Sequence, residues 1–221
     1  MKIDDIEQFA KNIEGKINFD YDIKKHNWFN IGGKTKIFFR PESLNELIDF
    51  LKLYGQRGKI FVLGAGSNVL FEDKTFEGVI IKLGNKFSNI SQLNQNVLVA
   101  GSATLDKKLS EFAKEKSLGG LEFLSAIPGS IGGGIRMNAG CFNTEFKDVL
   151  ISIQVADYNG KVFTIVANKI NFSYRETDLP KNYIFLSASF KGIKKNKKDI
   201  EEKTDKLKKQ KELAQPIRIT T

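Results

Sequence analysis

Two glycine-rich tracts constrain the fold of this chain more than any other feature of its sequence. The first, Gly64-Ala65-Gly66-Ser67-Asn68, directly follows a short apolar run, and the second places four glycines and a proline within residues 127–134. Glycine loses much backbone entropy on folding, so this density is costly unless the conformation is needed. Small residues let a backbone approach a ligand, and successive N–H groups form a concave donor surface for phosphate. We infer two anion-binding loops, which together suit a diphosphate.

Each tract also has an interpretation that needs no ligand. The first is equally consistent with a tight strand-to-loop turn, and it is not a Rossmann fingerprint because the third glycine and the following amphipathic helix are absent. The second continues into residues 135–142, whose small and amide side chains suit a flat heterocycle. It is also consistent with a glycine-rich packing segment.

The few cysteines and histidines exclude several kinds of site. One Cys and one His among 221 residues rule out a disulfide framework, and a Cys/His zinc site or nucleophilic pair unless the two residues meet. We therefore expect no metal site. We interpret Cys141 as a small buried apolar residue and His26 as an exposed or capping residue near a turn. The charged N-terminus and the lack of an 18-residue apolar run predict no signal peptide, no membrane span and a cytoplasmic location.

The net charge of +9 comes largely from one segment. Residues 191–212 hold ten Lys and five acidic residues, without any Phe, Tyr or Trp for base stacking. Ile200, Thr204, Leu207 and Lys211 recur near helical spacing, which gives one thin apolar stripe. We interpret the segment as a solvated connecting helix rather than a nucleic-acid arm, and we expect no nucleic-acid partner.

Hydrophobic periodicity predicts a mixed α+β chain. Ser43 begins a helix, with Glu46 completing a capping box, and Asn159-Gly160 joins two alternating runs as a hairpin. The predicted strands are 36–40, 59–63, 78–83, 96–100, 151–158, 162–166 and 184–190, and a second helix spans 105–115. We infer two α+β subdomains that meet across their glycine loops, with boundaries at 1–85, 86–195 and, for the basic connecting helix, 196–221.

A phenol and a guanidinium stand side by side at Tyr174-Arg175. Arginine does not lose its proton in proteins, so it serves as a fixed electrophile for a carboxylate or enolate rather than as an acid or base. The alternative is an exposed Arg175 paired with Glu176 or Asp178.

Taken together, the motifs resemble the UDP-N-acetylenolpyruvoylglucosamine reductase family, also called UDP-N-acetylmuramate dehydrogenases, over nearly the whole chain. Each piece alone is weak, but their order and spacing are specific. The matching pieces are Trp28 to Gly33, Leu63 to Leu70, Gly119 to Phe123, Ile127 to Gly133, Met137 to Gly140, Ser173-Tyr174-Arg175 and Gln215-Pro216.

The resemblance implies the two-subdomain FAD-binding fold of the vanillyl-alcohol oxidase (PCMH-type) kind, with FAD held noncovalently. The loops then hold the pyrophosphate, and Asn138 and Gly140 lie near the flavin. The residues that the resemblance assigns to the cofactor are Leu63, Gly64, Ala65, Gly66, Ser67, Asn68, Val69, Leu70, Ile127, Pro128, Gly129, Ser130, Gly132, Gly133, Asn138 and Gly140.

The family reaction is a step of peptidoglycan precursor synthesis. NADPH reduces FAD, and the enolpyruvyl ether of UDP-N-acetylglucosamine is then reduced to the lactyl ether. By resemblance, Arg175 stabilises the enolate-like intermediate as the catalytic residue and also binds the substrate, and Tyr174 helps to place that UDP-sugar.

Three departures qualify the resemblance. The short segment after Arg175 indicates the family's shorter branch, and Cys141-Phe142-Asn143 replaces the usual Ala-Tyr-Gly. The sequence stops at Thr221, before the third domain that supplies the family's proton donor, so we expect these residues to lack that donor and full turnover. Another flavin oxidoreductase of the same fold and a noncatalytic FAD-binding remnant stay open as alternatives, as does the oligomeric state.

Overall fold

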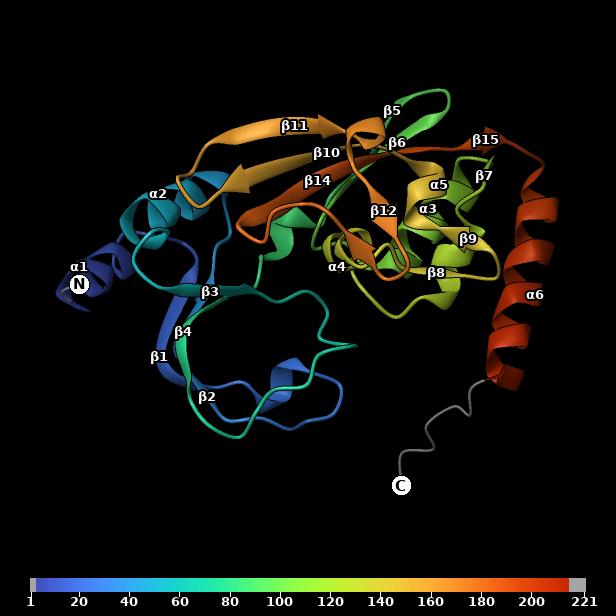
Figure 1. Ribbon diagram of the computed structural model, residues 1–221. Helices are drawn as coiled ribbons and strands as arrows, with labels where there is room; N and C mark the ends of the chain where they lie inside the picture. Colours follow the sequence, from blue (N-terminus) through green and yellow to red (C-terminus); the bar gives the residue numbers. More distant parts are fainter. Residues whose placement is uncertain (1–2, 215–221) are drawn as a thin grey trace.

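The computed structural model describes residues 3–214, and it contains two sheets that lie side by side (Figure 1). The first has four strands in the order β1-β2-β4-β3, in which β1 pairs antiparallel with β2 and the other pairs are parallel. Its strands are β1 (Lys16–Asp22), β2 (Lys34–Arg40), β3 (Lys59–Val62) and β4 (Phe76–Ile81).

The second sheet has five antiparallel strands in the order β11-β10-β14-β6-β5. Its strands are β5 (Ile90–Asn94), β6 (Val97–Gly101), β10 (Leu150–Asp157), β11 (Val162–Val166) and β14 (Tyr183–Lys191). Three two-stranded ribbons accompany it, formed by β7 (Leu118–Gly119) with β15 (Ile193–Lys194), β8 (Gly140–Cys141) with β9 (Thr144–Glu145), and β12 (Phe172–Ser173) with β13 (Glu176–Thr177).

Six α-helices and four 3-10 turns complete the described part of the chain. The α-helices are α1 (Ile3–Ala10), α2 (Leu44–Tyr54), α3 (Asp106–Glu115), α4 (Ile131–Arg136), α5 (Phe146–Val149) and α6 (Lys197–Ala214). The 3-10 turns are η1 (Lys24–His26), η2 (Asn85–Phe87), η3 (Glu122–Ala126) and η4 (Ala167–Lys169).

The predicted strands and the hairpin are confirmed, with end points that shift by one or two residues. In the hairpin, Gly160 has φ +79°, and the carboxylate of Asp157 accepts from the amides of Asn159 and Lys161 at 2.9 Å each. Strands β1 and β5 were not predicted. The two apolar residues of β5, Ile90 and Leu93, do not alternate with polar ones, so its pattern is weak. Strand β1 does alternate polar and apolar residues, and its sequence carried a signal that was missed.

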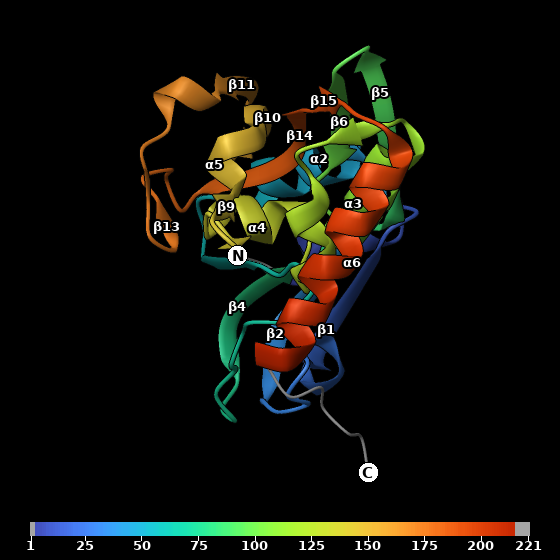
Figure 2. The ribbon, with the colours of Figure 1, turned by 90° about the vertical axis from the view of Figure 1, so that its right-hand side faces the viewer.

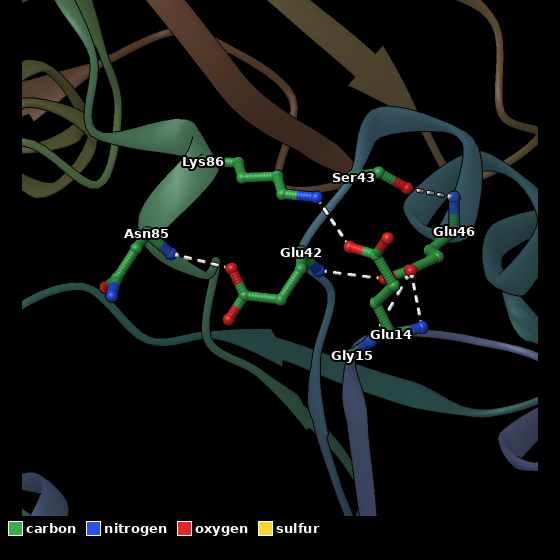
Figure 3. Close-up of polar contacts among 7 residues, drawn as sticks. All are labelled: Glu14, Gly15, Glu42, Ser43, Glu46, Asn85 and Lys86. Atoms are coloured by element: carbon green, nitrogen blue, oxygen red, sulfur yellow. Dashed lines mark hydrogen bonds and ion pairs between the residues drawn. The ribbon is translucent and has the colours of Figure 1, made fainter.

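The capping box predicted for α2 is half right (Figure 3). Ser43 caps the helix as expected, because its hydroxyl accepts from the amide of Glu46 at 3.3 Å. The carboxylate of Glu46 does not return to Ser43. It accepts instead from the amides of Glu42 at 2.8 Å, Glu14 at 2.9 Å and Gly15 at 3.4 Å, and so ties the start of β1 to the start of α2.

One apolar core joins the two sheets. Phe39 of β2 and Phe50 of α2 lie with their ring centroids 4.3 Å apart and are fully buried. Ile184 and Leu186 of β14 belong to the same buried cluster. Separating the sheets would expose this cluster to water, and apolar burial stabilises by about 25 cal/mol per Å². The shared cluster therefore holds the two sheets together.

The basic segment forms a helix that lies along α3 and η3 (Figure 2). The predicted apolar stripe is confirmed at Ile200, Thr204 and Leu207, which are buried. Lys211 lies at the edge of the stripe and donates to the carbonyl of Ala126. The helix therefore packs on the segment that leads into the second glycine tract.

The sequence indicated a loop over the whole second glycine tract, but the structure shows a loop only in its first part. Its last residues form α4, although three successive glycines are poor helix formers. An added Cβ at Gly134 would collide with the ring of Phe146, and one at Gly132 would come within 3.1 Å of the Ser102 Cβ. Gly132 and Gly134 thus meet a packing requirement, which agrees with the interpretation of the tract as a packing segment, whereas a Cβ at Gly133 would make only an ordinary contact.

Candidate functional site

The structure brings the two glycine tracts into contact. The hydroxyl of Ser67 in the first donates to the carbonyl of Pro128 in the second. An added Cβ at Gly64 would lie 2.6 Å from the Ser130 hydroxyl, so a side chain there would force that hydroxyl to move. Two loops from different halves of the chain thus lie in contact.

The first loop is held by backbone hydrogen bonds to β4 and to the aromatic segment near Trp28. Leu63 is buried and donates its amide to Ile81 at 2.8 Å, whereas Leu70 at the other end is 69% exposed. Gly66, with φ +73°, accepts from the amide of Trp28 at 3.0 Å. The aromatic segment singled out in the sequence therefore supports this loop.

A partly buried lysine contacts the first loop. Lys82 donates to the carbonyl of Gly64 at 2.7 Å, and burial together with the charge of Arg40 lowers the pKa of Lys82. Burial, then the charges of Lys82 and Arg40, lowers the pKa of His26, so this ring adds little positive charge at neutral pH. The ammonium of Lys82 favours an anion nearby. Sequence reasoning missed Lys82, which directly follows β4.

His26 differs from the predicted exposed residue. Its ring is half-buried and stacks on Phe38 at 4.6 Å between centroids, and its Nε2 lies 3.2 Å from the hydroxyl of Tyr21. Cys141 is partly buried, with its thiol donating to the carbonyl of Phe123 at 3.3 Å. Burial raises the pKa of that thiol, so Cys141 is a poor nucleophile.

The second loop is lined by buried polar groups that have no partner among the described residues. The hydroxyl of Ser130, which faces Gly64, and that of Thr104 make no hydrogen bond. The backbone on either side pairs, with Ile131 donating to Thr104 at 2.9 Å. Buried hydroxyls are normally satisfied, so the free Ser130 hydroxyl suits a phosphate oxygen. The loops fit a diphosphate on this ground.

Asp106 is the most perturbed group beside the loop. It is fully buried, neither carboxyl oxygen has a partner among the described residues, and its Oδ2 lies 2.6 Å from where a Cβ on Gly129 would stand. Burial raises its pKa to about 8. The carboxyl is therefore largely protonated at neutral pH. Sequence reasoning missed this residue, which reads as an ordinary first-turn helix acid.

Tyr174 and Arg175 form the two-residue turn between β12 and β13. Tyr174 is 84% exposed, and the guanidinium of Arg175 lies 5.7 Å from its ring centroid. Arg175 has φ +60°. Asp178 accepts from Asn171 rather than from Arg175. The turn therefore exposes a guanidinium and a phenol to solvent.

Asn138 and Gly140, predicted near the flavin, lie beside this turn. The amide of Asn138 donates to the carbonyl of Ser173 at 3.2 Å, and Gly140 pairs with Glu145 in the β8–β9 ribbon. The side chain of Asn138 is thus engaged by the protein. Gln215-Pro216, the last matching piece of the sequence, lies outside the described residues.

Comparison with known proteins places the chain in a family. Residues 35–165 match the FAD binding domain family. The chain is 61% identical over all 221 residues to the UDP-N-acetylenolpyruvoylglucosamine reductase of Pelagibacter ubique, and it covers 73% of that protein. The chain belongs to the UDP-N-acetylenolpyruvoylglucosamine reductase family. The reductase of Rickettsia canadensis is 40% identical over 209 residues, which are 95% of this chain and 70% of that protein.

Solved structures agree with the assignment to the UDP-N-acetylenolpyruvoylglucosamine reductase family. The reductase of Thermus caldophilus matches with a TM-score of 0.80 and 25% identity, over 93% of this chain and 72% of that one. Physcomitrella patens BBE-like 1 shares the fold, with a TM-score of 0.61 and 15% identity over 85% and 44% of the two chains. The predicted α+β, two-subdomain FAD-binding fold of the PCMH kind is confirmed. Within residues 3–214, no helix is long and apolar enough to cross a membrane.

Proposed function

We propose that this chain reduces the enolpyruvyl ether of UDP-N-acetylglucosamine to UDP-N-acetylmuramate, with NADPH as the reductant. The observation that carries the proposal is the 61% identity over the whole chain to a reductase of this name. The reaction adds a hydride and a proton across the carbon–carbon double bond of the enolpyruvyl group, and NADPH is oxidised. It places the chain in peptidoglycan precursor synthesis in the cytoplasm.

The two glycine loops are the proposed cofactor site. Residues 63–70 and 127–133 hold the diphosphate of FAD, with the free hydroxyl of Ser130 and the positive charge of Lys82 beside it. Bound FAD supplies a two-electron carrier between NADPH and the substrate. Gly64 places no side-chain atoms beside the Ser130 hydroxyl, and the backbone N–H groups of such loops form a donor surface for phosphate.

Arg175 is the proposed catalytic residue, with Tyr174 beside it. Hydride addition to the enolpyruvyl group places negative charge on the carbon next to the substrate carboxylate. The guanidinium of Arg175 binds that carboxylate with two parallel N–H donors and stabilises the delocalised charge. The exposed ring of Tyr174 packs against the substrate and limits its orientation.

Product analysis tests the proposed function. The FAD-loaded chain is incubated anaerobically with NADPH and the enolpyruvyl sugar nucleotide, and the nucleotide is followed by mass spectrometry. We expect a product heavier by two hydrogens, one of them deuterium when the transferred hydride of NADPH is labelled. Oxidation of NADPH without a change in the nucleotide contradicts the substrate assignment. Bound flavin that NADPH does not reduce indicates a noncatalytic FAD-binding protein.

A further inference from the structure

Asn138 lies where α4 ends, in a backbone conformation that glycine usually provides. Its φ is +39°, its amide donates to the carbonyl of Ile135 at 3.0 Å, and the next amide, of Ala139, donates to Gly134 at 2.8 Å. These two bonds form a Schellman motif, in which the left-handed residue is most often glycine. Asparagine is tolerated there at some cost, which contacts of its side chain can offset.

The side chain of Asn138 is buried, with 1% of its surface exposed, and each of its polar atoms has a partner. Its Nδ2 donates to the carbonyl of Ser173 at 3.2 Å and to Oε2 of Glu145 at 3.0 Å. Its Oδ1 accepts from the amide of Lys147 at 3.2 Å. Both N–H donors are in use, and a buried network satisfied in this way rigidifies its members.

Those bonds fix the hairpin that carries Tyr174 and Arg175. Ser173 is the last residue of β12, directly before the turn. On the returning strand, the hydroxyl of Thr177 donates to the carbonyl of Arg136 at 3.3 Å. Both strands of this ribbon therefore attach to the last turn of α4, which continues from the second glycine loop. The turn itself is exposed and depends on these anchors for a defined position.

The carboxylate that Asn138 binds also has a second partner. Lys147 and Glu145 form an ion pair of 2.6 Å, and the amide of Asn138 donates to the same carboxylate oxygen at 3.0 Å. The hydrogen bond from Lys147 and then the one from Asn138 lower the pKa of Glu145 against its burial. Glu145 is thus held by both side chains.

We propose that Asn138 is a positioning residue for Arg175, which acts by holding the carbonyl of Ser173 and the carboxylate of Glu145 against the end of α4. This role rests on the proposed function, in which Arg175 binds the substrate carboxylate. It differs from the flavin contact that the resemblance assigns to Asn138. In this role the side-chain amide of Asn138 supports the substrate site. Helix α4 connects the second glycine loop to Asn138 and so to the hairpin that carries Arg175.

Asn138→Gly is the sharpest variant, because glycine keeps the left-handed backbone and removes only the amide. Ser117→Gly is the matched control. Ser117 has φ +56° at the end of α3, and its amide donates to Lys114 at 3.0 Å. Hydrogen exchange is measured by mass spectrometry. We expect residues 172–177 to exchange about tenfold faster in Asn138→Gly and unchanged in the control. Unchanged exchange of the hairpin in Asn138→Gly overturns the positioning role.

Substrate affinity of the oxidised, FAD-loaded chain, followed through the flavin spectrum, tests the link to Arg175. We expect Asn138→Gly to weaken substrate binding about tenfold and FAD binding by less than about threefold. In an Arg175→Lys background, we expect Asn138→Gly to weaken substrate binding by less than about twofold, because the two residues act as a unit.

Three results of this measurement count against the account. An equal loss of FAD affinity, or additive effects of the two substitutions, overturns the positioning role. An unchanged affinity in Arg175→Lys alone contradicts the proposed function and overturns the positioning role with it. Hairpin exchange separates the two claims, since it reports the tether without substrate or cofactor.

Discussion

Replacing Asp106 by Asn should change how the stability of this chain depends on pH. Asp106 is fully buried and unpartnered among the described residues, and burial raises its pKa to about 8 from 3.8. The folded chain therefore keeps a proton that the unfolded chain loses above about pH 4. The stability of the wild type falls as pH rises between those two values, and this contribution levels off above the folded pKa.

The magnitude follows from the proton count. One proton more in the folded than in the unfolded state changes the free energy of unfolding by about 1.4 kcal/mol per pH unit. Between pH 5.5 and 7.5, Asp106 therefore lowers the stability of the wild type by about 3 kcal/mol. Burial alone causes this shift, so the fall in stability does not depend on the ionisation of a charged neighbour. The variant Asp106→Asn lacks the group and should not show this fall.

Urea unfolding followed by far-ultraviolet circular dichroism gives the free energy of unfolding at each pH. The free energy of unfolding of Asp106→Asn, relative to that of the wild type, should rise by about 3 kcal/mol from pH 5.5 to 7.5. Its absolute offset also contains the cost of burying the Asn amide, so the slope carries the test. Asp49→Asn, which removes an exposed carboxylate on α2, is the matched control. Parallel curves for Asp106→Asn and wild type would refute the reasoning.

The other substitutions probe the site and the fold. Arg175→Lys should keep FAD but lose about 10²-fold or more in the rate at which substrate reoxidises the reduced chain, because a point charge does not replace the planar fork; stopped-flow flavin absorbance measures this, and a normal rate contradicts the assignment. Lys82→Met should weaken FAD binding about tenfold and reduce its salt dependence, as measured by flavin fluorescence; an unchanged affinity removes Lys82 from the site. Glu46→Gln turns an N–H donor toward the amides that the carboxylate accepts from, and should cost about 2 kcal/mol in urea unfolding; a loss below about 0.5 kcal/mol would show that water replaces those bonds.

The sequence predicted most elements of the fold because their signals are local. The Ser43 cap, the Asn159-Gly160 hairpin and the stripe through Ile200 and Leu207 are set by neighbours a few residues away. Strand β1 was missed although its own residues alternate polar and apolar; only its pairing with β2 needed the structure. Helix α4 was missed for a different reason, because its signal is not local. Its glycines are explained by Phe146 and Ser102, which are distant in sequence.

The candidate site was predictable as two loops and one turn, and less so in its supporting groups. Glycine density marks the loops, and Tyr174-Arg175 marks the turn. Lys82 and Asp106 could not be recognised, since their roles come from burial and from contacts made across the fold. The sequence also did not reveal the protein partners of the Asn138 amide, which donates to Ser173 and Glu145. Partners of a side chain, unlike its type, depend on tertiary structure.

The visible absorption spectrum of the purified chain tests the central claim most directly. The chain is loaded with FAD, and anaerobic NADPH and then the enolpyruvyl sugar nucleotide are added to the same sample. We expect a protein-bound flavin spectrum that bleaches with NADPH and recovers with the nucleotide. A colourless protein that FAD does not reconstitute would contradict the cofactor site between the two glycine loops, and a bleached flavin that the nucleotide does not restore would contradict the proposed reductase reaction.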